Sequence, residues 1–213
     1  MRHHSNCSDW GYDSHPDRIK VTKRCKLICR IALSRTNFLD IDKHSTRRAH
    51  SFVFHGLTPD ACTCLLGSYR GTPTCTWLAN CQVGVLQDSF VGIPPYLVHD
   101  EMEKLERQCE ALVAVHAMWK LKTGAAPAAP VALLKFVTLL AIILERFLTI
   151  HPYMDGNGHS ARILIFVMMA REGYKPKHWD VDAKQPYDSA LYHHRRGKRG
   201  ELQKFLLQTI TGP

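Results

Sequence analysis

Twelve consecutive residues, HPYMDGNGHSAR at 151–162, combine a histidine, a carboxylate, two glycines around an asparagine, and an arginine. A loop of this composition that runs into a helix presents backbone N–H groups at the positive end of the helix dipole, where phosphates bind. Gly156 and Gly158 permit a close approach of the backbone, and the Asn157 amide adds a hydrogen-bond donor. The run therefore predicts a phosphate-binding loop.

The charged and titratable side chains of the same run indicate a reaction at this loop. His159 and Arg162 lie three residues apart at the start of the predicted helix, so they share a face, and Arg162 can pair with phosphate oxygens. Asp155 is an acid beside an anion site, which is favourable when a Mg²⁺ ion lies between the carboxylate and the phosphates. His151 is then the candidate general base, because imidazole accepts a proton near neutral pH.

The run resembles the Fic motif, commonly written His-Pro-Phe-x-(Asp/Glu)-Gly-Asn-Gly-Arg-x-x-Arg, with Tyr153 at the aromatic position and His159 at the first arginine. The segments GSYRGTP at 67–73 and YDSAL…GELQKFL near the end are also similar to Fic domains, so the resemblance covers residues 45–211. It implies an all-α fold, a Fic-like helical domain with a small β-hairpin flap. We expect an N-terminal extension at 1–45 and a Fic domain at 46–213.

The resemblance also implies a function, protein adenylyltransferase, which moves AMP from ATP to a Ser, Thr or Tyr hydroxyl of a target protein. It makes His151 the base and Asp155 the Mg²⁺ ligand. The nucleotide- and phosphate-binding residues that it implies are Gly156, Asn157, Gly158, His159 and Arg162. The flap would align the target protein by strand addition, through Thr74, Cys75, Thr76 and Trp77.

The histidine at position 159 leaves the nucleotide donor open. A neutral imidazole offers one donor where a guanidinium offers five and a permanent charge. Two alternatives therefore stand beside AMP transfer: another nucleoside monophosphate or phosphate from a different donor, and a degenerate Fic fold that binds nucleotide or a partner without turnover. The inhibitory pattern (Ser/Thr)-x-x-x-Glu-(Gly/Asn) does not occur in the sequence. We expect either a separate antitoxin-like inhibitory protein or an unrestrained enzyme.

Buried helices must position this loop. The apolar run at 131–150 leads into it and ARILIFVMMAREGY follows it, so the loop is expected between two core helices, 131–149 and 159–172. A third, amphipathic helix to about Lys122 is predicted by the 3,4,3,4 spacing of its apolar face. That face comprises Met102, Leu105, Cys109, Leu112 and His116.

Shorter elements are expected around these three helices. Capping signals predict short helices after Thr46 and after Thr58, and a final helix pair is expected at 187–194 and 201–210. The stretch 28–33 fits either a helix or a strand. The run 71–91 is rich in Thr, Val, Cys and Trp and lacks helical periodicity, which favours a β-hairpin.

Composition narrows the functional classes. The chain has 213 residues, 45% hydrophobic and 22% charged, which is typical of a soluble globular domain. Its formal net charge of +9 admits acidic ligands such as nucleotides. The basic stretches lack interleaved aromatic residues, which argues against specific nucleic-acid binding. The run 131–150 contains three charged residues, so we expect a core helix and no membrane span.

The eight cysteines include no Cys-x-x-Cys pair. The spacings Cys25-x₃-Cys29 and Cys62-x-Cys64 do not match a standard zinc knuckle. We therefore expect free, partly buried thiols in a reducing cytosol. The corresponding location is cytoplasmic, with delivery into a host cell as a further option.

Overall fold

The computed structural model describes residues 7, 10–34, 46–84, 88–123, 130–177, 179–181 and 187–212. Within these ranges the chain is helical, which confirms the predicted all-α class. The α-helices are α1 (Ile19–Ser34), α2 (Arg47–Phe54), α3 (Thr76–Ala79), α4 (Pro95–Thr123), α5 (Pro130–Ile150), α6 (Asn157–Arg171), α7 (Asp188–Arg195) and α8 (Gly200–Thr211). Two 3-10 helices are η2 (Tyr12–Ser14) and η4 (Asp60–Leu65).

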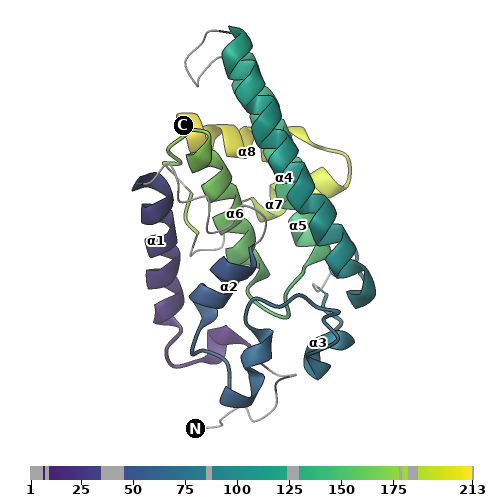
Figure 1. Cartoon of the computed structure of the whole chain (residues 1–213). Helices are drawn as coiled ribbons and strands as arrows, with labels where there is room; N and C mark the ends of the chain where they lie inside the picture. Colours follow the sequence, from purple (N-terminus) through teal and green to yellow (C-terminus); the bar gives the residue numbers. More distant parts are fainter. Residues whose placement is uncertain are drawn as a thin grey trace.

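Helix α5 lies at the centre of the fold, in contact with α4, α6 and α8 (Figure 1). Its side chains Phe136, Leu140 and Phe147 are completely buried, as expected for a helix that is apolar on most sides. Helix α6 is almost equally buried. The two core helices expected on either side of the loop are thus confirmed. None of the helices in the described ranges has the length and hydropathy needed to cross a membrane.

Helix α4 packs along α5 and extends past the other helices in Figure 1. Its predicted apolar face is confirmed, since Met102, Leu105 and Leu112 are buried. His116 on this face is fully buried. Its Nδ1 lies 2.6 Å from Glu172 Oε2, and its Nε2 lies 3.1 Å from the Tyr174 hydroxyl. This polar cluster joins α4 to the end of α6.

Residues 10–34, which lie in the expected N-terminal extension, pack against the rest of the molecule. Helix α1 lies against α6 and α2. Its buried face contains Val21, Cys25 and Ile28. The stretch 28–33, for which helix and strand were both open, therefore forms the second half of α1.

The β-hairpin expected at 71–91 is not seen in the described part of this segment, and that prediction needs correction. Thr76–Ala79 form the helical turn α3. The Gly71 N–H donates to the Leu78 carbonyl at 2.7 Å, which closes the segment into a compact turn. The β-propensity of Thr and Val yields here to tertiary contacts. Residues 85–87 lie outside the described ranges.

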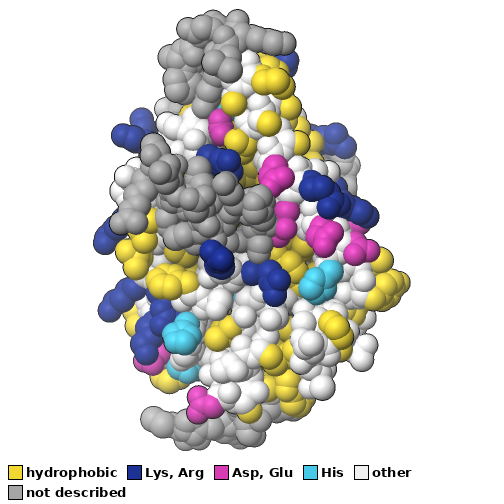
Figure 2. Space-filling model, in the orientation of Figure 1, with side chains coloured by type: hydrophobic (Ala, Val, Ile, Leu, Met, Phe, Trp, Pro, Cys, Tyr) yellow, Lys and Arg dark blue, Asp and Glu magenta, His cyan; other side chains and the backbone are white. Residues whose placement is uncertain are grey.

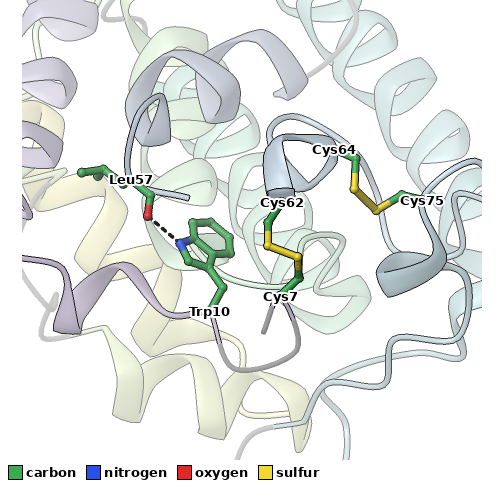
Figure 3. Close-up of a disulfide and its surroundings, with 6 residues drawn as sticks. All are labelled: Cys7, Trp10, Leu57, Cys62, Cys64 and Cys75. Carbon is green, nitrogen blue, oxygen red and sulfur yellow. Dashed lines mark hydrogen bonds between the residues drawn. A yellow bond between two sulfur atoms is a disulfide. The ribbon is translucent and has the colours of Figure 1, made fainter. Parts of the chain in front are cut away.

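The expectation of free thiols is wrong for four of the eight cysteines. Disulfides join Cys7 to Cys62 and Cys64 to Cys75 (Figure 3), with Cα–Cα distances of 5.6 and 5.9 Å. The 3-10 helix η4 directs its two cysteines toward different segments of the chain, a relation that spacing alone does not reveal. The free cysteines are Cys25, Cys29, Cys81 and Cys109. Disulfides are typical of oxidising compartments, so the argument for a reducing cytosol loses its basis.

Basic side chains are distributed over the face of the molecule seen in Figure 2. On the face seen in Figure 2, Lys and Arg side chains lie over several elements and alternate with acidic ones. A groove of about 530 Å³ is lined by Lys26, Arg30 and Lys177 above Trp179. The observed face shows no single basic stripe of the kind that follows a nucleic-acid backbone.

The buried cluster of His116, Glu172 and Tyr174 leads to a prediction about the stability of the protein. His116→Ala removes the imidazole beside the Glu172 carboxylate and opens a cavity at a fully buried position, so the free energy of unfolding is expected to fall by about 2–5 kcal/mol. Arg107→Ala on the same helix is the control, because Arg107 and Glu103 form an exposed ion pair at 3.7 Å that contributes little. Urea denaturation of both variants measures the difference. Equal losses would contradict the assigned role of His116.

Candidate active site

The predicted phosphate-binding loop connects α5 to α6 and is held in shape by Asn157. This side chain is only 3% exposed. Its Oδ1 accepts the Tyr153 N–H and its Nδ2 donates to the Tyr153 carbonyl, both at 2.8 Å. The amide that we expected at a phosphate therefore folds the loop. Asn157 and Tyr153 are only four residues apart, but the presence of an asparagine does not tell whether its amide binds the backbone or a ligand.

The two glycines of the motif are both closely packed, and Gly156 also has a backbone conformation that favours glycine. Gly156 has φ +76°, and a Cβ atom there would lie 2.3 Å from Phe54 Cε2. A Cβ atom on Gly158 would lie 3.0 Å from Arg162 Nη1. Helix α6 begins beside them without a side-chain cap and without an acid in its first turn. Such a helix start is suited to an anion.

His151 is the one non-glycine residue in the described ranges with positive φ, at 53°. Its Nδ1 lies 3.2 Å from the Leu148 carbonyl, and because a carbonyl only accepts, Nδ1 carries the proton. Nε2 is then left with a free lone pair. Burial lowers the pKa of His151 to about 4, the Leu148 bond opposes this, and Arg70 and Arg195 lower the pKa further. The imidazole is therefore neutral at neutral pH and can accept a proton at Nε2.

Arg70 fixes the conformation around His151 and was not recognised as a site residue from the sequence. It is completely buried. Its guanidinium donates to four backbone carbonyls at 2.8–3.0 Å, and its own N–H donates to the Pro152 carbonyl at 2.8 Å. The four acceptors belong to Cys81, Ile93, Ile150 and His151. The sequence carries no signal for this role, because the acceptors are main-chain atoms.

His50 on α2 supports the loop from the other side. Gly67 N–H donates to its Nδ1 at 3.0 Å, so Nε2 carries the proton and donates to the Asp155 carbonyl at 3.0 Å. Its ring stacks on Tyr153 at a centroid distance of 3.9 Å. Burial lowers the pKa of His50 to about 4, although the bond to Asp155 opposes the shift. His50 is a second supporting residue that the motif does not include.

Asp155 has the properties of a cation ligand. Its Oδ1 accepts the Gly156 N–H at 2.6 Å and its Oδ2 accepts the Tyr12 N–H at 3.1 Å. Burial raises the pKa of Asp155, and these two N–H groups oppose the shift. The ion pairs found among the described residues do not involve it, and no cluster of three metal-binding side chains occurs among them. One carboxylate without a basic partner fits Mg²⁺, which usually takes its other ligands from phosphates and water.

His159 and Arg162 have different neighbours, although both were predicted to face the phosphates. The Nδ1 of His159 lies 3.1 Å from the Tyr12 hydroxyl, and its ring meets Tyr12 and Phe54 edge-on. Arg162 is 7% exposed and donates from Nε to the Val181 carbonyl at 3.0 Å. Its Nη1 lies beside Gly158. The structure therefore keeps Arg162 next to the loop and encloses His159 in an aromatic pocket.

The residues predicted to contact the target protein differ in accessibility. Thr74, Thr76 and Trp77 are exposed, with Trp77 at 44%. Cys75 is buried in its disulfide with Cys64. Three of the four side chains are thus accessible to another protein, on a helical turn in place of the expected strand.

The family model described as the Fic/DOC family matches residues 40–169, which is more than half of the chain. The chain belongs to the Fic/DOC family. It is 32% identical over 66 residues to the protein adenylyltransferase fic-1 of Caenorhabditis briggsae, and equally to that of Caenorhabditis elegans. The matched segment is 31% of this chain and 12% of each relative's length. No solved structure matches the chain.

The four hydrogen bonds of the Arg70 guanidinium lead to a prediction about the stability of the protein. Arg70→Lys keeps the charge but cannot reach four carbonyls from one ammonium, so the free energy of unfolding is expected to fall by at least about 2 kcal/mol. Arg24→Lys is the matched control, since Arg24 donates to only two carbonyls, those of Val53 and His55, and is less buried. Chemical denaturation compares the two variants. A similar small effect at both positions would show that the four bonds of Arg70 are not essential.

The two buried histidines predict a pH dependence of stability. Burial lowers the pKa of His50 and His151 from 6.5 to about 4. Between these pH values the unfolded chain binds protons that the folded chain does not. The free energy of unfolding is therefore expected to fall as the pH decreases from 6.5 toward 4, by up to about 1.4 kcal/mol per pH unit for each histidine. Denaturation of His151→Ala across this range should show a smaller slope than the wild type, whereas equal slopes would contradict the buried neutral state of His151.

Proposed function

We propose that this Fic protein transfers AMP from ATP to a hydroxyl group of a target protein. Membership of the family and the partial similarity to protein adenylyltransferases support a Fic-type transferase. The observation that carries the finer proposal is the neutral His151, whose Nδ1 is tied to Leu148 so that Nε2 remains a base. This base lies in the loop that leads to the uncapped start of α6.

The reaction follows from these groups. The target hydroxyl oxygen attacks the α-phosphorus, a new P–O bond forms, and the bond from that phosphorus to the β-phosphate oxygen breaks, which releases pyrophosphate. His151 Nε2 accepts the hydroxyl proton. The N–H groups at the start of α6 and the guanidinium of Arg162 hold the phosphates. Asp155 would hold Mg²⁺, which neutralises phosphate charge.

The low pKa of His151 is compatible with this role. At neutral pH the imidazole carries no proton to be removed first. A bound triphosphate brings negative charge near the imidazole, which raises its pKa and makes Nε2 a stronger base. Arg70 prevents the histidine from turning away, because it binds the carbonyls of Ile150 and His151.

A second candidate function, nucleotide binding without turnover, is favoured by one observation. Tyr12 contacts both Asp155 and His159, so two groups that we assign to cation and phosphate binding are engaged within the protein. A protein locked in this arrangement would not complete the reaction. Transfer and its absence are distinguished by a direct assay.

The assay uses purified protein with Mg²⁺, cell lysate and each of the four nucleotides in turn. We expect a mass increase of one AMP on a target hydroxyl with ATP. His151→Ala is expected to lower the transfer rate by at least about 10²-fold, because it removes the general base from a loop without altering the core. His193→Ala is the control, since His193 pairs with Glu201 on the exposed side of α7.

Circular dichroism of each variant verifies that the fold is retained. Transfer by His151→Ala at the wild-type rate would exclude His151 as the base. Labelling from UTP, GTP or CTP in place of ATP would redirect the proposal to another donor. Nucleotide binding without any labelled product would support the second candidate function.

A further inference from the structure

A short N-terminal segment lies over the motif. We call Cys7 together with Trp10–Ser14 the N-terminal strap. Within it, Tyr12 donates its backbone N–H to Asp155 Oδ2 at 3.1 Å, and its hydroxyl lies 3.1 Å from His159 Nδ1. Its ring packs on Phe54 at a centroid distance of 4.9 Å. One residue of the strap thus contacts both the candidate cation ligand and the residue that replaces the motif arginine.

The strap is fixed at both ends. On one side Cys7 is bonded to Cys62, and the Trp10 indole N–H donates to the Leu57 carbonyl at 2.9 Å (Figure 3). Trp10 is 7% exposed and meets Phe54 edge-on. On the other side the strap continues into α1, which packs against α6 and α2. The position of Tyr12 is therefore determined by the fold and is not that of a loose terminus.

The strap competes with a cation for Asp155. Each carboxylate oxygen has two lone pairs, and the Tyr12 N–H uses one of those on Oδ2. The strap backbone also lies against this oxygen, since a Cβ atom on Gly11 would be 3.7 Å from Oδ2. The Gly156 N–H belongs to the loop itself, whereas the Tyr12 N–H comes from outside it. Removal of the strap would remove the Tyr12 contacts from Oδ2 of Asp155 and from Nδ1 of His159 together.

We propose that the N-terminal strap is a cover over the active site, latched by the Cys7–Cys62 disulfide and released when a thiol reductant breaks that bond. The inference rests on the proposed function, in that Asp155 and His159 are taken as ligands of cation and phosphate. In the latched protein Tyr12 holds both groups. In the released protein the strap exchanges between covered and open positions, and the nucleotide binds the open one.

Release is a two-electron reduction of the Cys7–Cys62 disulfide by a thiol reductant. Two thiols of the reductant become one disulfide, while Cys7 and Cys62 each take up an electron and a proton and become thiols. Once the bond is broken, Cys7 no longer anchors the start of the strap to η4, and the strap stays attached to the domain through α1. Both cysteines are buried, so the reductant reaches the bond only after local opening of the N-terminal segment. Release is accordingly expected to be slow.

The first experiment compares the oxidised wild type with Cys7→Ser, and Cys64→Ser is the matched control that breaks the other disulfide on η4. Mn²⁺ serves as the probe, in the presence of ATP, and its binding is followed by electron paramagnetic resonance. We expect Cys7→Ser and the reduced wild type to bind Mn²⁺–ATP about tenfold more tightly than the oxidised wild type. Cys64→Ser is expected to match the oxidised wild type.

Hydrogen exchange of the peptide that contains residues 10–14 reports the strap itself. We expect faster exchange in Cys7→Ser and unchanged exchange in Cys64→Ser. Tyr12→Ala tests the cover with the latch intact, and should increase both exchange and Mn²⁺–ATP affinity. Tyr12→Phe keeps the ring and the N–H and loses only the bond to His159, so its effect should be smaller.

The outcomes separate this inference from the proposed function. Slow exchange of the strap in Cys7→Ser would show that the disulfide is not the latch. Fast exchange with unchanged Mn²⁺–ATP affinity would show that the strap does not cover the ligands. Either result overturns the inference. Tighter binding on release without any transfer to a target would support the inference and contradict the proposed function.

Discussion

The guanidinium of Arg70 is enclosed by protein, and every partner found for it in the described part of the chain is a backbone carbonyl. A buried charge without a carboxylate is costly unless oriented dipoles surround it. Two of the acceptors, at Ile150 and His151, lie at the C-terminal end of α5, where the helix dipole is negative. The charge is therefore compensated by the end of the central helix. An arginine suits this position because the N–H donors of its planar guanidinium point in different directions and can reach several carbonyls at once.

This arrangement affects the protonation of His151 as well as its position. The chain leaves α5 at His151 in a left-handed conformation, which is unfavourable for a residue with a side chain. Arg70 binds the carbonyl of that same residue, so it stabilises the conformation from which the loop starts. The positive charge also disfavours a protonated imidazole nearby. One buried cation thus orders the loop and adds to the effect of burial, which is the main reason that the pKa of His151 is low.

The sequence predicted those structural features for which all the necessary residues lie within one segment. The core helices were recognisable because their apolar residues recur with helical spacing, and the position of the loop followed from the positions of these helices. Prediction from the sequence failed where the partner is distant or is a main-chain atom. The roles of Arg70 and His50 depend on carbonyls that every residue possesses. The contacts of Tyr12 with the motif join segments that no local pattern relates, and the helical turn α3 forms within 71–91 despite the β-propensity of that segment.

The placement of two cysteines on the single 3-10 turn η4 has a consequence for biosynthesis. The Cys64–Cys75 bond closes a segment of 11 residues, and the Cys7–Cys62 bond closes one of 55. Short loops close with the smaller entropy loss, so the local bond is expected to form first. Once Cys64 is occupied, Cys7 can no longer pair with the wrong neighbour on the turn. Oxidation is then expected to proceed from the body of the domain to the N-terminal segment, so that the loop between α5 and α6 is in place before Cys7 is bonded.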